Sequence, residues 1–274
     1  MVRRKIEGQH HPLAKTIRRM VRSGELAQDG FVLLETVRLM EDALASGVPI
    51  PRVLVSTHAV VHLKRLLERL PKDTTVYELS PKVFETLGST ETGQGILGLA
   101  EEPRWQEDDL FPPGRPPLIL VLARLQDPGN LGTLLRTAEA FGATGVLLTQ
   151  GTVSPFNAKA IRATAGALFR IPMLRGLPVA AVLAVLRRRR VKLFTSVVAG
   201  GTPLPAANLT GPAAVVFGAE GAGAPLEFRA VGEPLTIPLA APVESLNVAS
   251  AAAVILYEIA RQREAVVRKA VVSD

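Results

Sequence analysis

Residues 237–258 constrain the fold most, because they join the end of a strand, a loop of prolines and small residues, and a long helix. A short apolar strand is expected to stop at Pro238, and Ser245 and Asn247 flank the start of an alanine-rich helix. Serine and asparagine are good helix N-caps, and the positive end of the helix dipole faces the loop. Small side chains let this helix lie close to a neighbour. Taken alone, the stretch is also typical of an ordinary amphipathic core helix.

Two stretches upstream also place a polar or glycine-rich turn after an apolar strand. The first has a strand over 118–123, the turn Gln126-Asp-Pro-Gly-Asn-Leu-Gly132, and a helix that carries Arg136 and Glu139. The second has an apolar strand that runs into Gly218-Ala-Glu-Gly-Ala-Gly223. In this order and spacing, the three stretches resemble the three motifs of the SpoU (TrmH-like) branch of the SPOUT RNA methyltransferases. The resemblance covers about residues 118–263.

The resemblance implies an α/β SPOUT domain with a C-terminal trefoil knot, which general topology rules would not suggest. It also implies methyl transfer from S-adenosylmethionine to a ribose 2′-hydroxyl of RNA, in a homodimer whose active site draws on both subunits. The catalytic residues that it implies are Asn130, Arg136, Glu220, Ser245 and Asn247. The cofactor residues that it implies are Thr195, Gly218, Ile237, Leu239 and Leu246, with the cofactor bound largely through main-chain groups.

A 2′-hydroxyl is a poor nucleophile that must be aligned and must lose its proton near the transition state. All four histidines lie before residue 63 and the chain has no cysteine, so Ser-His-Asp hydrolysis and His or Cys metal sites are excluded from the C-terminal part. No metal is expected. Arg136 is a candidate base, although a neutral guanidinium is rare at pH 7, or a clamp for the neighbouring phosphate and the developing oxyanion.

Each candidate also has a purely structural interpretation. Arg136 could pair with Glu139 three residues along its helix. Asn130 could be a turn residue after Pro128. Glu220 could order Arg136 or Asn130, or be an exposed turn carboxylate. The turn that contains Glu220 is not Gly-x-Gly-x-x-Gly and comes late in the chain, so a Rossmann dinucleotide site is the weaker interpretation.

The first hundred residues alternate strands with helices, which predicts an α/β sandwich of about 90 residues. It is similar to the L30e-like substrate-binding domain of many SpoU enzymes. Phe31-Val-Leu-Leu-Glu-Thr-Val-Arg matches the opening of that domain, with Thr36 where glycine is common, and 89–95 matches its close. Residues 1–11 are expected to be disordered. The expected strands are 31–34, 52–56, 75–78 and 95–100, and the expected helices are 11–23, 35–45, 58–70 and 81–87.

Five prolines among acidic residues mark 102–117 as a semi-rigid linker. The predicted domains are therefore an RNA-binding domain over 1–101, the linker, and the methyltransferase domain over 118–274. In the latter we expect further strands over 145–149, 192–196, 215–218 and 235–237, and helices over 158–168 and 179–190. The four arginines at 187–190 are either favourable charges at a helix C-terminus or contacts to an RNA backbone.

The net charge is +7, and it suits a polyanionic partner. It divides into +2 for 1–101, −2 for 102–117 and +7 for 118–274. Basic residues on two predicted helices are the candidate RNA contacts: Lys15, Arg18, Arg19, Arg22, Lys159 and Arg162. No apolar run of 18 residues and no secretory signal is present, so no membrane span is expected, and the lack of cysteine fits a reducing cytoplasm.

The L30e-like domain, rather than short terminal helices, favours ribosomal RNA as the substrate, and large-subunit RNA in particular. A tRNA ribose methyltransferase is the alternative within the same enzyme class. A non-catalytic RNA-binding or ribosome-assembly protein that has kept the fold is the alternative from another class. The presence of Arg136, Glu220 and Asn247 argues against the non-catalytic alternative.

Overall fold

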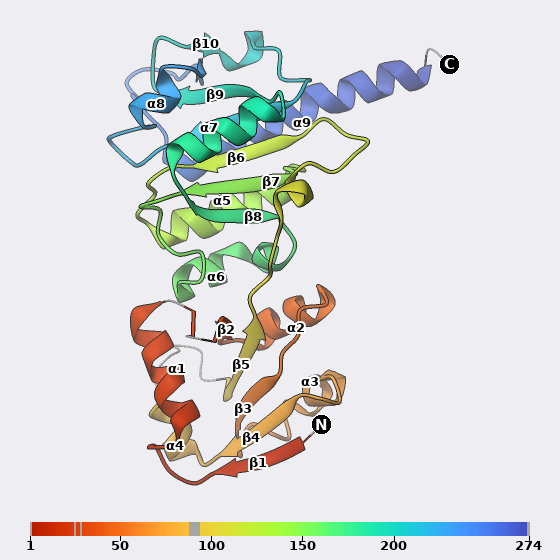
Figure 1. Ribbon diagram of the computed structural model, residues 1–274, viewed down its shortest axis with the longest axis vertical. Coiled ribbons are helices and arrows are strands. Elements are labelled where there is room, and N and C mark those ends of the chain that lie inside the picture. Colours follow the sequence, from red (N-terminus) through yellow and green to blue (C-terminus); the bar gives the residue numbers. More distant parts are fainter. Residues whose placement is uncertain (1, 25, 28, 88–93, 273–274) are drawn as a thin grey trace. The chain divides into compact units, whose positions relative to one another are not determined.

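Two compact units make up the chain in the computed structural model, which describes residues 2–24, 26–27, 29–87 and 94–272 (Figure 1). Unit 1 comprises Met1–Arg104 and Ser154–Phe169. Unit 2 comprises Trp105–Val153 and Arg170–Asp274. The described part of the chain has no helix that is long and apolar enough to cross a membrane.

A five-stranded mixed sheet forms the centre of unit 1, in the order β1-β4-β3-β5-β2. Strands β1, β4 and β3 are parallel, and β5 runs antiparallel to β3 and β2. Helices α1 and α4 cover one face, and α2 and α3 the other (Figure 1). The bounds are β1 Val2–Ile6, α1 Pro12–Ser23, β2 Phe31–Leu34, α2 Val37–Ala45, β3 Arg52–Ser56, α3 Lys64–Arg69, β4 Thr75–Leu79, α4 Pro81–Glu85 and β5 Ile96–Glu101.

The prediction of disorder over 1–11 is wrong for β1. This strand pairs with β4 along its whole length, Ile6 is buried, and Arg3 donates to Glu78 at 2.9 Å. The strand was not predicted from its polar sequence, because an edge strand is held by backbone pairing and does not require an apolar face. The helix predicted over 58–70 is also shorter, since only Lys64–Arg69 is helical. Residues 89–93 of the predicted closing stretch over 89–95 lie outside the described residues.

Helix α1 carries the apolar spacing predicted for it. Leu13, Ile17 and Met20 are buried against the sheet residues Leu54 and Leu79. The Nδ1 atom of His11 accepts from the Leu13 N–H at 3.2 Å and caps the start of the helix. At the other end Gly24 adopts a φ of 65°, the left-handed conformation that ends many helices. Unit 1 therefore presents α1 as a firmly packed amphipathic helix.

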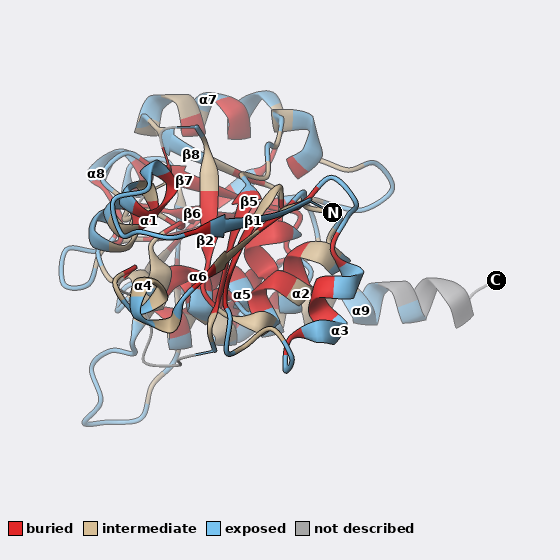
Figure 2. Cartoon of the chain, turned by 90° about the horizontal axis from the view of Figure 1, so that it is seen from below, coloured by how far each residue is buried: buried red, intermediate tan, exposed pale blue. Residues whose placement is uncertain are grey.

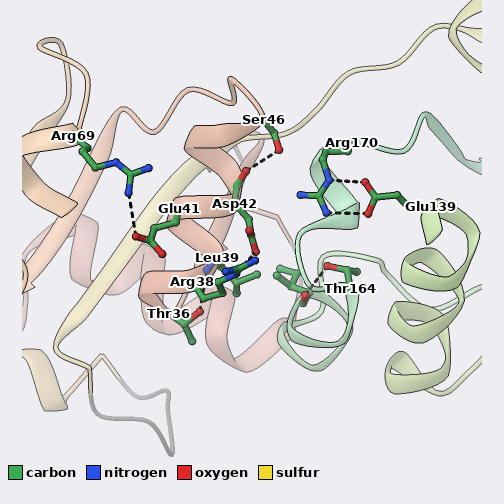
Figure 3. A network of polar contacts seen from close by, with 11 residues as sticks. Thr36, Arg38, Leu39, Glu41, Asp42, Ser46, Arg69, Glu139, Thr164 and Arg170 are labelled. Atoms are coloured by element: carbon green, nitrogen blue, oxygen red, sulfur yellow. Dashed lines mark hydrogen bonds and ion pairs between the residues drawn. The ribbon is translucent and has the colours of Figure 1, made fainter. Parts of the chain in front are cut away.

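Thr36 has a clear structural task, although glycine is usual at this position in the domain that the sequence resembles. Its hydroxyl accepts from the Leu39 N–H at 3.2 Å and caps α2 (Figure 3). At the other end of α2, the Ser46 hydroxyl donates to the Asp42 carbonyl at 2.7 Å. Threonine is a good N-cap residue, so the substitution is compatible with the fold.

Helix α6 (Ala158–Thr164) packs as part of unit 1, although the sequence placed it in the methyltransferase domain. Arg162 forms a 2.8 Å ion pair with Glu35, a carboxylate that is only 3% exposed. Burial raises the pKa of Glu35, and the Arg162 guanidinium opposes that shift. Arg162 is thus engaged within unit 1, whereas the sequence had made it a candidate RNA contact.

Unit 2 contains a seven-stranded parallel sheet in the order β10-β12-β9-β11-β6-β7-β8. The described strands are β6 Leu118–Leu122, β7 Gly145–Thr149, β8 Met173–Leu177, β9 Lys192–Val197, β10 Thr202–Pro203, β11 Ala213–Phe217 and β12 Glu233–Thr236. The helices are α5 Pro128–Ala140, α7 Val179–Arg188, α8 Leu226–Arg229 and α9 Val248–Val272. Strands β8 and β10 and helix α8 were not predicted. Strand β10 and helix α8 are too short to carry a clear periodicity, and β8, Met-Leu-Arg-Gly-Leu, contains a charged residue and a glycine.

Helix α7 lies on one face of this sheet, and α5 and α9 lie on the other (Figures 1 and 2). Val182 and Leu186 of α7 join a core with Phe228 of α8 and residues of β6, β7, β9 and β11. Strands β6, β7 and β11 are buried along their whole length, as expected for a parallel sheet covered on both faces. The trefoil knot stays a prediction.

Most of the predicted linker packs against unit 2. A short 3₁₀ helix, η1 (Glu107–Leu110), inserts Leu110 into the core beside Gly145, where an added Cβ would come within 2.4 Å of the leucine. Arg188 and Arg189 both bind the Glu107 carboxylate, and Arg189 also binds Asp108. These bonds, that from Arg188 foremost, lower the pKa of Glu107. Two of the four arginines at 187–190 therefore form ion pairs within unit 2.

Candidate active site

A cavity of about 650 Å³ opens in unit 2 beyond the carboxyl ends of β9, β11 and β12. Its walls come from residues 196–198 at the end of β9, from 217–224 at the end of β11 and in the turn that follows, and from the loop after β12 that leads into α9. Ligands of open parallel α/β sheets bind at this edge, and the volume is in the usual range of roughly 300–1,000 Å³ for small-molecule sites. The cavity is therefore the natural cofactor site.

The glycine-rich turn is folded tightly on itself. The Gly223 N–H donates to the Ala219 carbonyl at 2.8 Å, and Gly221 and Gly223 adopt φ values of 78° and 68°. A Cβ added to Gly218 would lie 2.0 Å from the backbone of Gly223. No side chain fits at Gly218 unless the turn moves, so glycine is required there to shape the cavity wall.

Three predicted catalytic side chains meet beside this turn. Asn130 donates through Nδ2 to Glu220 Oε1 at 2.5 Å. Asn247 donates through Nδ2 to Asn130 Oδ1 at 3.2 Å and to the same Glu220 oxygen at 3.4 Å. We call Asn130, Glu220 and Asn247 the polar triad. Glu220 thus orders Asn130, one of the two roles that the sequence left open, and Glu220 and Asn247 both line the cavity.

Helix caps hold two members of the triad in place. Asn247 Oδ1 accepts from the Ala249 N–H at 2.9 Å and caps the start of α9. Asp127 caps α5 by accepting from the Asn130 N–H at 2.7 Å, so Asn130 belongs to the first helical turn and is not a loop residue. Both helix N-termini, with their partial positive charge, therefore lie beside the Glu220 carboxylate.

The structure brings Ser245 to the cavity wall but does not bring Arg136 there. Ser245 is exposed and lies two residues before the cap of α9. Arg136 is exposed on α5, and its side chain has no hydrogen-bond or ion-pair partner among the described residues. The possible pair with Glu139 is not formed, because Arg170 binds both oxygens of that carboxylate, at 2.5 and 2.9 Å (Figure 3).

Four of the five predicted cofactor residues line the cavity: Gly218, Ile237, Leu239 and Leu246. Thr195 does not. It is 1% exposed, and its Cγ2 would lie 2.9 Å from a Cβ on Gly232. Successive residues of a strand face opposite sides, and the next residue, Ser196, lines the cavity instead.

Two charged residues of the cavity, Arg229 and Glu244, were not predicted from the sequence. Both are exposed, and neither side chain has a bonding partner in the described part of the chain. Arg229 ends α8, which was not predicted, and Glu244 directly precedes the motif serine. Two signals could have pointed to them: an arginine six residues after the glycine-rich turn, and a carboxylate directly before the motif serine.

This lining fits S-adenosylmethionine, the cofactor that the resemblance implies. Ile237, Leu239 and Leu246 supply apolar surface for an adenine ring, and the turn from Gly218 offers main-chain groups. Arg229 and Glu244 match the charges of an amino-acid end. Among the residues that the structure describes, no group of three or more His, Asp or Glu side chains is arranged to hold a metal ion.

The basic residues predicted to bind RNA differ in how free they are. Lys15, Arg18, Arg19 and Arg22 line one shallow hollow on α1. Arg18 is half-buried and donates to the Gln9 carbonyl at 2.6 Å and to the Thr86 hydroxyl at 3.4 Å. The other three are exposed, and within the described ranges their side chains have no partner. Lys159 is exposed on α6.

The shape of the turn at Gly218 gives a direct test. Gly218→Ala should weaken binding of S-adenosylhomocysteine about tenfold or more, because the new Cβ must displace the cavity wall. Gly211→Ala is a matched control, since a Cβ there meets nothing within 4 Å. Titration calorimetry measures both. Equal affinities for the two folded variants would show that the turn does not shape the site.

Comparison with known proteins agrees with this geometry. The SpoU rRNA Methylase family matches residues 117–257, and the MRM3-like substrate binding domain matches residues 12–98. An uncharacterised tRNA/rRNA methyltransferase from Synechocystis sp. is 35% identical, over 94% of this chain and 94% of that protein. The 23S rRNA guanosine 2′-O-methyltransferase RlmP of Bacillus subtilis is 32% identical, over 93% of this chain and 99% of its own length.

Among solved structures, an AdoMet-bound rRNA methyltransferase from Sinorhizobium meliloti superposes with a TM-score of 0.82 at 28% identity, covering 94% of this chain and 98% of that one. The same family is indicated by the cavity at the strand ends, by the polar triad and by the likeness along nearly the whole chain. The chain belongs to the SpoU rRNA methylase family, whose members are S-adenosylmethionine-dependent RNA 2′-O-ribose methyltransferases.

Proposed function

We propose that this enzyme methylates a ribose 2′-hydroxyl of large-subunit ribosomal RNA, in the cytoplasm and as a homodimer. The observation that carries the proposal is the polar triad, two of whose members, Glu220 and Asn247, line the cofactor cavity. RlmP acts on 23S rRNA and aligns with nearly all of this chain, which supports rRNA over tRNA. Exposed Lys15, Arg19 and Arg22 on α1 give unit 1 a surface for phosphates.

The triad has a chemical role that follows from its bonds. S-adenosylmethionine supplies an electrophilic methyl group on a sulfonium sulfur. Glu220 Oε1 is held by the two asparagines, while Oε2 has no bonding partner in the described part of the chain. This second oxygen can accept a hydrogen bond from the ribose and orient its 2′-hydroxyl, which is the alignment that a weak nucleophile needs.

Arg136 supports the homodimer. It lies off the cavity of its own chain, it is exposed, and it is not used by any ion pair among the described residues. Val254 and Tyr257 on α9 are also exposed, by 40% and 57%, and Tyr257 packs edge-on against Phe141 at the end of α5. We infer that α5 and α9 contribute to a dimer contact and that Arg136 serves the site of a partner subunit.

Arg136 should act on the RNA and not on the cofactor. Arg136→Ala is expected to lower the methyl-transfer rate about 100-fold or more, as loss of a transition-state donor does, with S-adenosylhomocysteine affinity nearly unchanged. Single-turnover kinetics and calorimetry test this. A large loss of cofactor affinity would assign Arg136 a different role, and an unchanged rate would remove it from catalysis.

The two charges of the cavity define the amino-acid end of the cofactor site. We propose that Arg229 binds its carboxylate and Glu244 its ammonium group. Arg229→Gln should weaken binding of S-adenosylhomocysteine about tenfold, because a charge-assisted hydrogen bond is lost. Binding of 5′-methylthioadenosine, which lacks the amino-acid end, should stay the same. Equal losses for both ligands, or none for either, would contradict this assignment.

A transfer assay tests the proposed substrate. The purified chain is incubated with labelled S-adenosylmethionine and unmodified 23S rRNA, 16S rRNA or tRNA, and the methylated ribose is mapped. Label on one 2′-oxygen of 23S rRNA is the expected result. Label on tRNA alone would favour the tRNA alternative. No label on any RNA, with the cofactor bound, would favour a non-catalytic RNA-binding protein.

A further inference from the structure

A second hollow in unit 1, of about 440 Å³, lies beside α1 and is used by nothing described so far. Residues of α1, β3 and β4 line it, together with Asp29 before β2. Leu13 and Tyr77 give it apolar surface, His11 forms a wall, and Arg19, Asp29 and Arg52 supply charges. Its volume falls within the usual range of small-ligand sites.

The register of the strands explains why the hollow exists. Leu54 of β3 lies opposite Tyr77 of β4, and Arg52 lies opposite Thr75, so these side chains share one sheet face. Helix α1 covers Leu54 within the core, whereas Tyr77 only packs against the edge of that core. Leu13, Thr16 and Arg19 are three residues apart along α1 and form the helix side of the hollow.

Two aromatic rings line the hollow, and a hydrogen bond holds one of them, that of His11. The His11 and Tyr77 ring centroids are 6.3 Å apart, at an interplanar angle of 57°. His11 cannot rotate freely, because its Nδ1 atom caps α1. Both residues line the hollow, His11 is exposed and Tyr77 is only half-buried. Tyrosine and histidine are residues on which proteins stack unpaired RNA bases.

The charges of the hollow favour a ligand that joins a flat ring to an anion. Arg52 lies over the Phe31 ring at 5.0 Å and pairs with Asp29 at 3.3 Å, and both charged groups remain partly exposed. Arg19 is exposed, and within the described residues nothing pairs with it. It belongs both to this hollow and to the basic surface of α1 with Lys15 and Arg22. A phosphate chain following that surface reaches the hollow at Arg19.

We propose that this hollow binds one unpaired nucleotide of the RNA substrate, with its base against Tyr77 and His11 and its phosphate at Arg19 and Arg52. The site rests on the proposed function in so far as RNA is the substrate. It gives unit 1 a preference for single-stranded segments such as loops and bulges. Phosphate contacts along α1 alone would give no such preference.

Tyr77→Leu tests the stacking surface, and Tyr77→Phe is the matched control that keeps the ring. The probe is a fluorescently labelled single-stranded hexanucleotide, with a fully paired RNA duplex as the second ligand, and binding to the full chain is followed by anisotropy. Tyr77→Leu should bind the hexanucleotide roughly fivefold or more weakly, Tyr77→Phe should match the parent, and duplex affinity should stay constant. Equal hexanucleotide affinity for all three proteins would overturn the proposal, as would an equal loss for both RNAs.

Photocrosslinking of the unaltered chain tests whether the hollow binds an RNA base, and it does not depend on whether a variant folds. A hexanucleotide that carries 5-iodouridine should crosslink to Tyr77 or His11, as found by mass spectrometry. Crosslinks confined to other residues would overturn the site. Calorimetry with S-adenosylhomocysteine and transfer to 23S rRNA are run in parallel. Methyl transfer without a crosslink at the hollow would remove this site and leave the proposed function intact.

Discussion

The hydrogen bonds of the polar triad are the interaction on which the site depends. They join the first turn of α5, the turn after β11 and the start of α9, which are 27 to 117 residues apart in sequence. Each asparagine is fixed by its helix as well, Asn130 through the cap at Asp127 and Asn247 by capping α9. One carboxylate thus connects three segments around the cavity. A substitution in one of these segments is expected to alter the positions of the other two.

The parallel sheet makes this convergence possible. Strands β9, β11 and β12 are neighbours and run the same way, so the segments that follow them emerge at one edge. Gly218 lets the chain turn back at once, since only a residue without a side chain fits against Gly223. The loop after β12 then adds Leu239 and Ser245 to the lining of the cavity. The order of the strands, one glycine and two helix caps together place the polar triad beside the cofactor cavity.

The sequence indicated many of the residues that belong to the site, but it did not indicate which of them form hydrogen bonds with one another. Asn130, Glu220 and Asn247 stand in recognisable motifs, but Glu220 could equally have bonded Arg136, because spacing along the chain does not show which groups meet. Thr195 was predicted as a cofactor residue, whereas its neighbour Ser196 lines the cavity, because successive residues of a strand face opposite sides and the sequence does not show which side faces the cavity.

The elements and contacts of the fold that were not predicted from the sequence also have physical explanations. The strand at Val2–Ile6 is polar and depends on pairing with a partner 73 residues away, which no local pattern reports. Helix α8 is a single turn, so Arg229 had no predicted element to place it. Helix α6 was found, but its packing on Glu35 was not, because only the folded unit buries that carboxylate. Strands β6, β7 and β11 were predicted, since all three are buried along their whole length and consist mostly of apolar residues.

A double-mutant cycle tests the polar triad most directly. Asn130→Ala removes one arm, and Asn247→Ser removes the other while keeping an N-cap for α9. Single-turnover methyl transfer is measured for the parent, both single variants and the double variant. Because both asparagines act through Glu220, we expect a coupling energy of about 0.5–3 kcal/mol, with the double variant much less impaired than the two losses combined. Losses that add within about 0.3–0.5 kcal/mol would contradict it, since independent residues behave in that way.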